Sequence, residues 1–153
     1  MNPQFKSMLD ALTDRARENL EDYGRLVPVA FIFSKGSFDI VACPWSGNEE
    51  KEAAIALLRR MARSKNADAI AILAEAWYAE LENCKSLDDW DGTPASKMKN
   101  REEVVHVYVE ALDGCWMGVA DITRDGGRPT FGKIEYLALG ERDRRERFQG
   151  ILA

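Results

Sequence analysis

Histidine and cysteine are scarce in this chain, and their scarcity excludes several kinds of site. The 153 residues contain one histidine and three cysteines, and no two cysteines stand in a C-x-x-C spacing. An odd number of widely spaced cysteines argues against a disulfide framework and against a thiolate zinc site. Zinc hydrolases usually supply two or three histidines, so a single histidine disfavours zinc catalysis. Because G-x-x-x-x-G-K and G-x-G-x-x-G are also missing, we expect no metal, no nucleotide and no other cofactor.

Long apolar runs and an excess of positive charge are missing as well. The longest mostly apolar stretch, residues 69–79, contains Glu75 and is shorter than the roughly 20 residues that span a bilayer. The first residues lack the charged-then-apolar layout of a secretion signal. The net charge of −5 argues against a dedicated nucleic-acid binder, because phosphate contacts supply most of that affinity. We therefore expect a cytoplasmic protein with no membrane contact and no nucleic acid as its main partner.

The remaining composition is that of one folded domain. With 46% hydrophobic and 31% charged residues, the chain resembles an ordinary globular protein, and we expect one domain over residues 1–153. Apolar residues at helical spacing predict an amphipathic helix over residues 3–23, ended by Gly24. A second helix is predicted over residues 49–65, with Asn48 as its N-cap and charges at both ends that suit the helix dipole.

Two alternating apolar runs, residues 27–34 and 38–43, predict a hairpin. Lys35 and Gly36 between them form a two-residue turn, which fixes the register of the two strands. The facing pairs are then Phe33 with Phe38, Phe31 with Ile40, and Val29 with Ala42. We expect the aromatic face of this hairpin to lie in the core.

The other strands complete the predicted fold. Residues 68–75 are apolar on both faces and favour a central strand, with a helix over residues 74–83 as the alternative. A last strand is predicted over residues 130–139. A helix between strands indicates one parallel crossover. The sequence thus predicts an α+β fold: a mixed, mostly antiparallel sheet of about five or six strands, with two main helices packed on it.

Asp113-Gly114 is the strongest hairpin signal in the chain, because an alternating apolar run lies on each side of it. A two-residue turn there predicts a register with these facing pairs: Glu103 with Arg124, His106 with Asp121, and Val107 with Ala120. A histidine across from an aspartate is the arrangement of an oriented general base. A cross-strand polar pair on a half-solvated sheet face is the alternative interpretation.

Glu75 lies near the end of the predicted central strand and is a third catalytic candidate. A carboxylate buried there, together with His106 and Asp121, is the residue set of a small hydrolase or transferase. The alternative is a carboxylate at the rim of the sheet that pairs with an arginine such as Arg101 or Arg124.

Residues 80–100 are polar and irregular, and loops of that length in compact domains tend to be functional or mobile. The basic residues Lys97, Lys99 and Arg101 follow Trp90, a combination found in single-strand nucleic-acid binding. These four residues are the candidate binding residues. Residues 141–153 form a charged C-terminal tail in which arginines alternate with acidic residues, a pattern typical of a solvated helix.

Residues 74–105 contain three short motifs: Ala74-Glu75-Ala76-Trp77, then Pro94, then Arg101-Glu102-Glu103-Val104-Val105. In these motifs the chain resembles a loosely defined set of uncharacterised bacterial and phage proteins. That set has no assigned reaction, so no catalytic role is implied. The resemblance implies a compact α/β domain and suggests a phage or prophage origin.

The leading hypothesis is a non-catalytic binding or interaction module that contacts a protein partner or a second copy of itself. Its contact surface is expected at the loop around Trp90 or at an exposed sheet edge. Self-association into a homodimer is expected at the last strand, residues 130–139, because a long edge strand must be covered. A small hydrolase or transferase and a nucleic-acid accessory protein remain as alternatives. An enzyme requires its catalytic residues to converge in one concave pocket, whereas an interaction module requires an exposed apolar patch.

Overall fold

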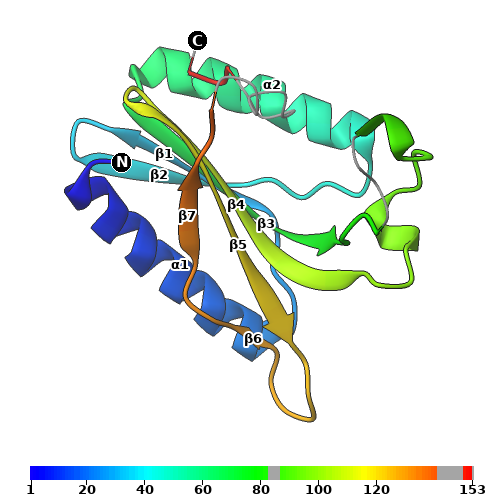
Figure 1. Cartoon of the computed structure of the whole chain (residues 1–153). Helices are drawn as coiled ribbons and strands as arrows, with labels where there is room; N and C mark the ends of the chain where they lie inside the picture. Colours follow the sequence, from blue (N-terminus) through cyan, green and yellow to red (C-terminus); the bar gives the residue numbers. More distant parts are fainter. Residues whose placement is uncertain (83–86, 141–149, 153) are drawn as a thin grey trace.

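An antiparallel sheet of seven strands has one long helix on each of its faces (Figure 1). The computed structural model describes residues 1–82, 87–140 and 150–152. The strand order is β2-β1-β3-β4-β5, and both β6 and β7 pair with β5. In chain order the elements are α1 (Pro3–Tyr23), β1 (Val29–Ser34), β2 (Ser37–Ala42), α2 (Asn48–Lys65), β3 (Ala69–Tyr78), the short 3₁₀ helices η1 (Leu87–Asp89) and η2 (Ala95–Lys97), β4 (Glu102–Ala111), β5 (Gly114–Thr123), β6 (Thr130–Phe131) and β7 (Glu135–Ala138).

The predicted α+β fold is confirmed, and the crossover takes a split form. Strands β2 and β3 both run antiparallel to β1, so they are parallel to each other with β1 between them. Helix α2 connects them across one face of the sheet. Every hydrogen-bonded strand pair among the described residues is therefore antiparallel, so the described sheet contains no parallel pairing.

Helix α1 begins and ends as its sequence predicts. The Asn2 side chain accepts a hydrogen bond from the Gln4 N–H at 2.8 Å, and Pro3 occupies the first turn, where its missing N–H is harmless. Gly24 adopts φ +77° and donates its N–H to the Leu20 carbonyl. The buried stripe of α1 packs on a cluster that includes Phe31, Phe33, Leu73, Val105 and Val107.

Helix α2 covers the opposite face. Its buried residues Ile55, Leu58 and Ala62 pack against side chains from β1, β3 and β4, which include Ile32, Ile70 and Tyr108. Gly47, and not Asn48, occupies the N-cap position, so the predicted cap is displaced by one residue. Across the described part of the chain, neither helix combines the length and the apolar character that crossing a membrane requires.

Strand β3 extends to Tyr78 and lies between β1 and β4, which confirms the central strand and excludes the helical alternative for residues 74–78. The first half of β3 is buried on both faces. The predicted last strand over residues 130–139 is wrong in one respect: it is divided into β6 and β7. Ile122 pairs with Phe131, and Val119 pairs with Glu135. Two residues of β5 lie between these pairs but three residues lie between them on the other segment, so one residue bulges out of the ladder.

The predicted register of the β1–β2 hairpin is confirmed pair by pair. Lys35 and Gly36 adopt φ +48° and +79°, the left-handed values that a type I′ turn requires. The expectation that this whole face is core is wrong on β2, because Phe38 is 41% exposed and Ile40 is 62% exposed. β2 is the outermost strand, and the cluster under α1 includes Phe31 and Phe33 of β1 but neither Phe38 nor Ile40.

The β4–β5 register differs from the prediction by two residues. The reversal occurs at Leu112 and Asp113, neither of which has a positive φ, and Gly114 begins β5 at φ +148°. The Leu112 N–H donates to the Asp68 carbonyl, a contact with the start of β3 that a local turn rule does not contain. The facing pairs are His106 with Val119, Val107 with Gly118, and Val105 with Ala120. A shift of two preserves the alternation of faces, so Val107 is buried as predicted.

Candidate functional site

The three candidate catalytic residues lie on two different faces of the sheet. Glu75 lies two residues after Leu73 on β3, so both side chains are on the face of the sheet that α1 covers. His106 lies two residues before Tyr108 on β4, so both side chains are on the opposite face, which α2 covers in part. Asp121 is on this face as well, because it lies directly across from Val104. The predicted pairing of His106 with Asp121 is wrong, because Val119 lies directly across from His106. The register therefore separates Glu75 from the other two residues.

Glu75 has the rim position that was the alternative to a catalytic role. Its Oε1 accepts the Leu26 N–H at 2.7 Å and lies 3.8 Å from Arg124. Arg124 also donates to both carboxylate oxygens of Glu103 at 2.8 Å, and to the Gly24 carbonyl at 2.8 Å. These bonds hold the pKa of the Glu103 carboxyl below its ordinary value. The register shift of two removes the predicted direct opposition of Glu103 and Arg124, but the long Arg124 side chain still reaches the Glu103 carboxylate. These interactions tie the end of α1 to the sheet.

Trp90 does not gather the basic residues around it. Its side chain is folded onto its own loop, where Nε1–H donates to the Thr93 carbonyl at 3.0 Å. The neighbouring cleft of about 370 Å³ has four carboxylates and one basic residue in its lining: Glu80, Glu82, Asp89, Asp91 and Lys99. Arg101 instead stacks over the Trp77 ring at 5.1 Å, and Lys97 lies exposed on η2. An acidic cleft disfavours phosphate binding at Trp90.

No metal site is found among the described residues, and the two described cysteines are buried. Within residues 1–82, 87–140 and 150–152, no three side chains of the His, Cys, Asp and Glu types lie where a metal ion needs them. Cys43 and Cys115 are buried and unbridged, and burial raises the pKa of the Cys43 thiol, which makes it a poor nucleophile. Cys84 lies outside the described residues.

Most of the predicted charged tail, residues 141–149 and 153, lies outside the described residues. The described end of the chain is held by a carboxylate that the sequence analysis missed. Ile151 is buried on the α2 face, and the N–H groups of Ile151 and Leu152 donate to the Glu110 carboxylate at 3.1 and 3.3 Å. The available signal was the apolar pair Ile151-Leu152 near the end of an otherwise highly charged tail.

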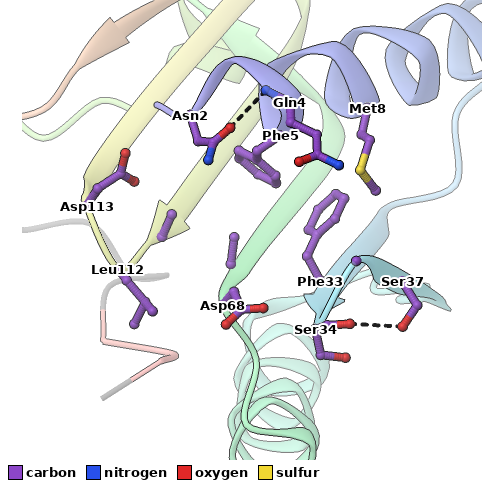
Figure 2. A pocket seen from close by; sticks show the side chains of 13 residues that line it. Asn2, Gln4, Phe5, Met8, Phe33, Ser34, Ser37, Asp68, Leu112 and Asp113 are labelled. Carbon is purple, nitrogen blue, oxygen red and sulfur yellow. Dashed lines mark hydrogen bonds between the residues drawn. The ribbon is translucent and has the colours of Figure 1, made fainter.

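A cleft of about 350 Å³ lies between the start of α1 and the β1–β2 turn. Figure 2 shows Phe5, Met8 and Phe33 pointing into it, with Asp68 and Asp113 at its margin. The Phe5 and Phe33 rings meet edge to face, with their centroids 4.6 Å apart. The floor is therefore apolar and largely aromatic.

A second cleft, of about 420 Å³, continues along α1 toward the other end of β2. Its lining is mostly apolar and includes Leu12, Phe31 and Ile40, with Arg15 and Arg25 as the basic members. The exposed side chains of Phe38 and Ile40 project from β2 on the same face as these two clefts. We call the outer edge of β2 together with the two clefts the β2 surface.

The backbone of β2 presents hydrogen-bonding groups at this surface. The Cys43 N–H donates to the Pro28 carbonyl, so odd-numbered residues of β2 direct their backbone groups toward β1. By alternation, Phe38, Ile40 and Ala42 direct their N–H and C=O groups outward. No described strand pairs with this side of β2. Phe38, Ile40 and Ala42 therefore present both outward main-chain groups and apolar side chains at this edge.

Comparison of the chain with protein-family models, with curated proteins and with solved structures finds no match.

Proposed function

We propose that this protein is a non-catalytic interaction module, and that it binds an extended segment of a protein chain at the β2 surface. The observation that carries the proposal is the outward direction of the backbone groups of Phe38, Ile40 and Ala42 beside two apolar clefts. An extended segment added to a free sheet edge gains affinity from main-chain hydrogen bonds and specificity from alternate side chains.

The character of β2 supports this mode of binding. Proteins usually protect edge strands with proline, charged residues, bulges or short length. β2 contains no proline and no bulge, and its only charged residue, Asp39, is paired with Lys65 at 2.9 Å. The strand therefore carries few of the features that keep an edge from pairing.

The two alternatives gain less support. A hydrolase or transferase built on Glu75, His106 and Asp121 requires these side chains to converge in one pocket, and they lie on opposite faces of the sheet. A nucleic-acid accessory protein requires basic groups around Trp90, whose cleft is lined mainly by carboxylates. The similarity around residues 74–105 carries no reaction and adds no activity, and a phage or prophage origin stays a suggestion.

A strand-forming peptide tests the proposal. The ¹⁵N-labelled full chain is titrated with the acetylated, amidated peptide Lys-Thr-Val-Thr-Val-Thr-Val-Lys, and the backbone amide signals are followed. We expect the largest shifts at Phe38, Ile40 and Ala42, and their loss in Ile40→Lys, which places a charge on the edge. Leu137→Lys on β7 is the matched control and should respond as the parent chain does. Unchanged signals of the three β2 amides at millimolar peptide, in a chain that light scattering shows to be monomeric, would contradict the proposal.

A further inference from the structure

We infer that the occupant of the β2 surface is a second copy of this chain, with the two β2 strands paired antiparallel about a two-fold axis at Ile40. This inference rests on the proposed function and names its partner. A two-fold dimer requires a surface that is complementary to itself. The backbone directions, charges and side chains of β2 meet that requirement in one register.

The backbone groups restrict the register first. In an antiparallel pair, two residues exchange both hydrogen bonds only when each directs its N–H and C=O toward the other strand. On β2 these are the even-numbered residues Phe38, Ile40 and Ala42. With the axis at Ile40, Ile40 faces Ile40 of the second copy, and Phe38 faces Ala42. Every outward group of the strand is then paired.

The neighbouring registers are each disfavoured by one residue. An axis at Asp39 places two carboxylates directly across from each other, which destabilises a strand pair. An axis at Val41 places Phe38 opposite Pro44, which has no N–H to donate. With the axis at Ile40, Asp39 faces Val41 of the second copy and keeps Lys65 as its ion-pair partner.

The side chains that the pairing covers are the exposed apolar ones. Phe38 and Ile40 lie on the α1 face, and the Phe38 ring already packs on Phe33 with centroids 5.9 Å apart. Facing the small Ala42 of the second copy leaves room for the Phe38 ring. Self-association is therefore placed at β2 and not at residues 130–139, where β7 offers only four residues at the edge.

Disulfide trapping tests the register in the full chain with Cys84 changed to serine. Facing Cα atoms in a hydrogen-bonded antiparallel pair lie about 5.5 Å apart, within the range of a disulfide. Ile40→Cys should therefore form a covalent dimer on mild oxidation. Asp39→Cys alone is the matched control and should form no covalent dimer, because the two introduced thiols would be two residues out of register. Asp39→Cys mixed with Val41→Cys should form the mixed disulfide.

Light scattering at micromolar concentrations gives the independent readout. We expect the parent chain and Leu137→Lys to be dimers, and Ile40→Lys to weaken the dimer about a hundredfold or more, because the two lysines face each other. A monomeric parent chain would overturn the inference, and the peptide titration then decides whether β2 binds a different chain. A dimer that persists in Ile40→Lys but is lost in Leu137→Lys would overturn it as well.

Discussion

The two outer edges of the sheet are built in opposite ways. β2 has six residues in unbroken register with its neighbour, and its outward residues are apolar. The other edge is divided by a bulge into β6 and β7, of two and four residues, and β7 begins with the charged Glu135. Short length, a bulge and a charge are the usual means of keeping an edge unpaired. Exposure alone does not distinguish the two edges, since Leu137 on β7 is 71% exposed.

The protected edge depends on one glycine of β5. A Cβ atom at Gly118 would overlap Cγ2 of the buried Ile134 and lie 3.0 Å from the Tyr136 ring. Gly118 therefore permits the close approach of the segment that carries the bulge and β7. The bare backbone at this position is what allows β7 to cover β5.

Breaking the protected edge should have the largest effect on stability. We expect Gly118→Ala to lower the free energy of unfolding by roughly 2–3 kcal/mol, because the added methyl group displaces Ile134 and Tyr136. Urea denaturation measures the change. Gly132→Ala is the control, since open space surrounds its Cβ position, and it should be nearly neutral. Equal stability of the two variants would show that β7 does not depend on close contact with Gly118.

The second prediction concerns the carboxylate that holds the C-terminal residues against β4. Glu110→Ala leaves the N–H groups of Ile151 and Leu152 without their acceptor, and we expect a loss of about 2 kcal/mol. Glu102→Ala on the exposed end of the same strand serves as the comparison and should change stability little. Amide exchange of Ile151 should accelerate in Glu110→Ala only; unchanged exchange would mean that the hydrogen bonds are dispensable.

The third prediction concerns Arg124, which follows β5 and pairs with Glu103 and Glu75. Arg124→Met should cost about 0.5–1 kcal/mol near neutral pH, a modest value because the pair is partly exposed. The pKa of Glu103 is lower in the folded chain than in the unfolded chain, so its contribution is present above the unfolded value and disappears as the pH falls through the folded value.

A pH series separates this ion pair from other effects. The parent chain should lose more stability than Arg124→Met between about pH 5 and pH 3. Thermal unfolding at a series of pH values measures the difference. Parallel curves for the two proteins would contradict a role of the Glu103 carboxylate in the pair.

The hairpins show how far sequence reasoning reaches. The β1–β2 register was predictable because Lys35 and Gly36 can form the type I′ turn locally. The β4–β5 register was not, because the turn, beside the contact from Leu112 to the Asp68 carbonyl, lies one residue earlier than predicted, which shifts the register by two. Local turn rules contain no information about such distant contacts. The burial of Val107 survived because a shift of two preserves the face.

The candidate site was predictable only in outline. An exposed sheet edge was a sequence hypothesis, but it was placed on residues 130–139, because the bulge that divides them has no distinctive local signal. The alternating pattern of β2 identifies an apolar face but does not tell whether a helix covers it. Glu75 was correctly foreseen as a possible partner of Arg124, because a rim position suits both long side chains.

Hydrogen exchange at the two edges, with and without the Lys-Thr-Val-Thr-Val-Thr-Val-Lys peptide, tests the central claim most directly. At a protein concentration low enough for light scattering to show the monomer, we predict that the peptide slows exchange at the amides of Phe38, Ile40 and Ala42, which direct their N–H groups outward. Exchange at Glu135–Ala138 should stay unchanged. Slowed exchange on β7, or unchanged exchange at the three β2 amides, would contradict the assignment of β2 as the binding edge.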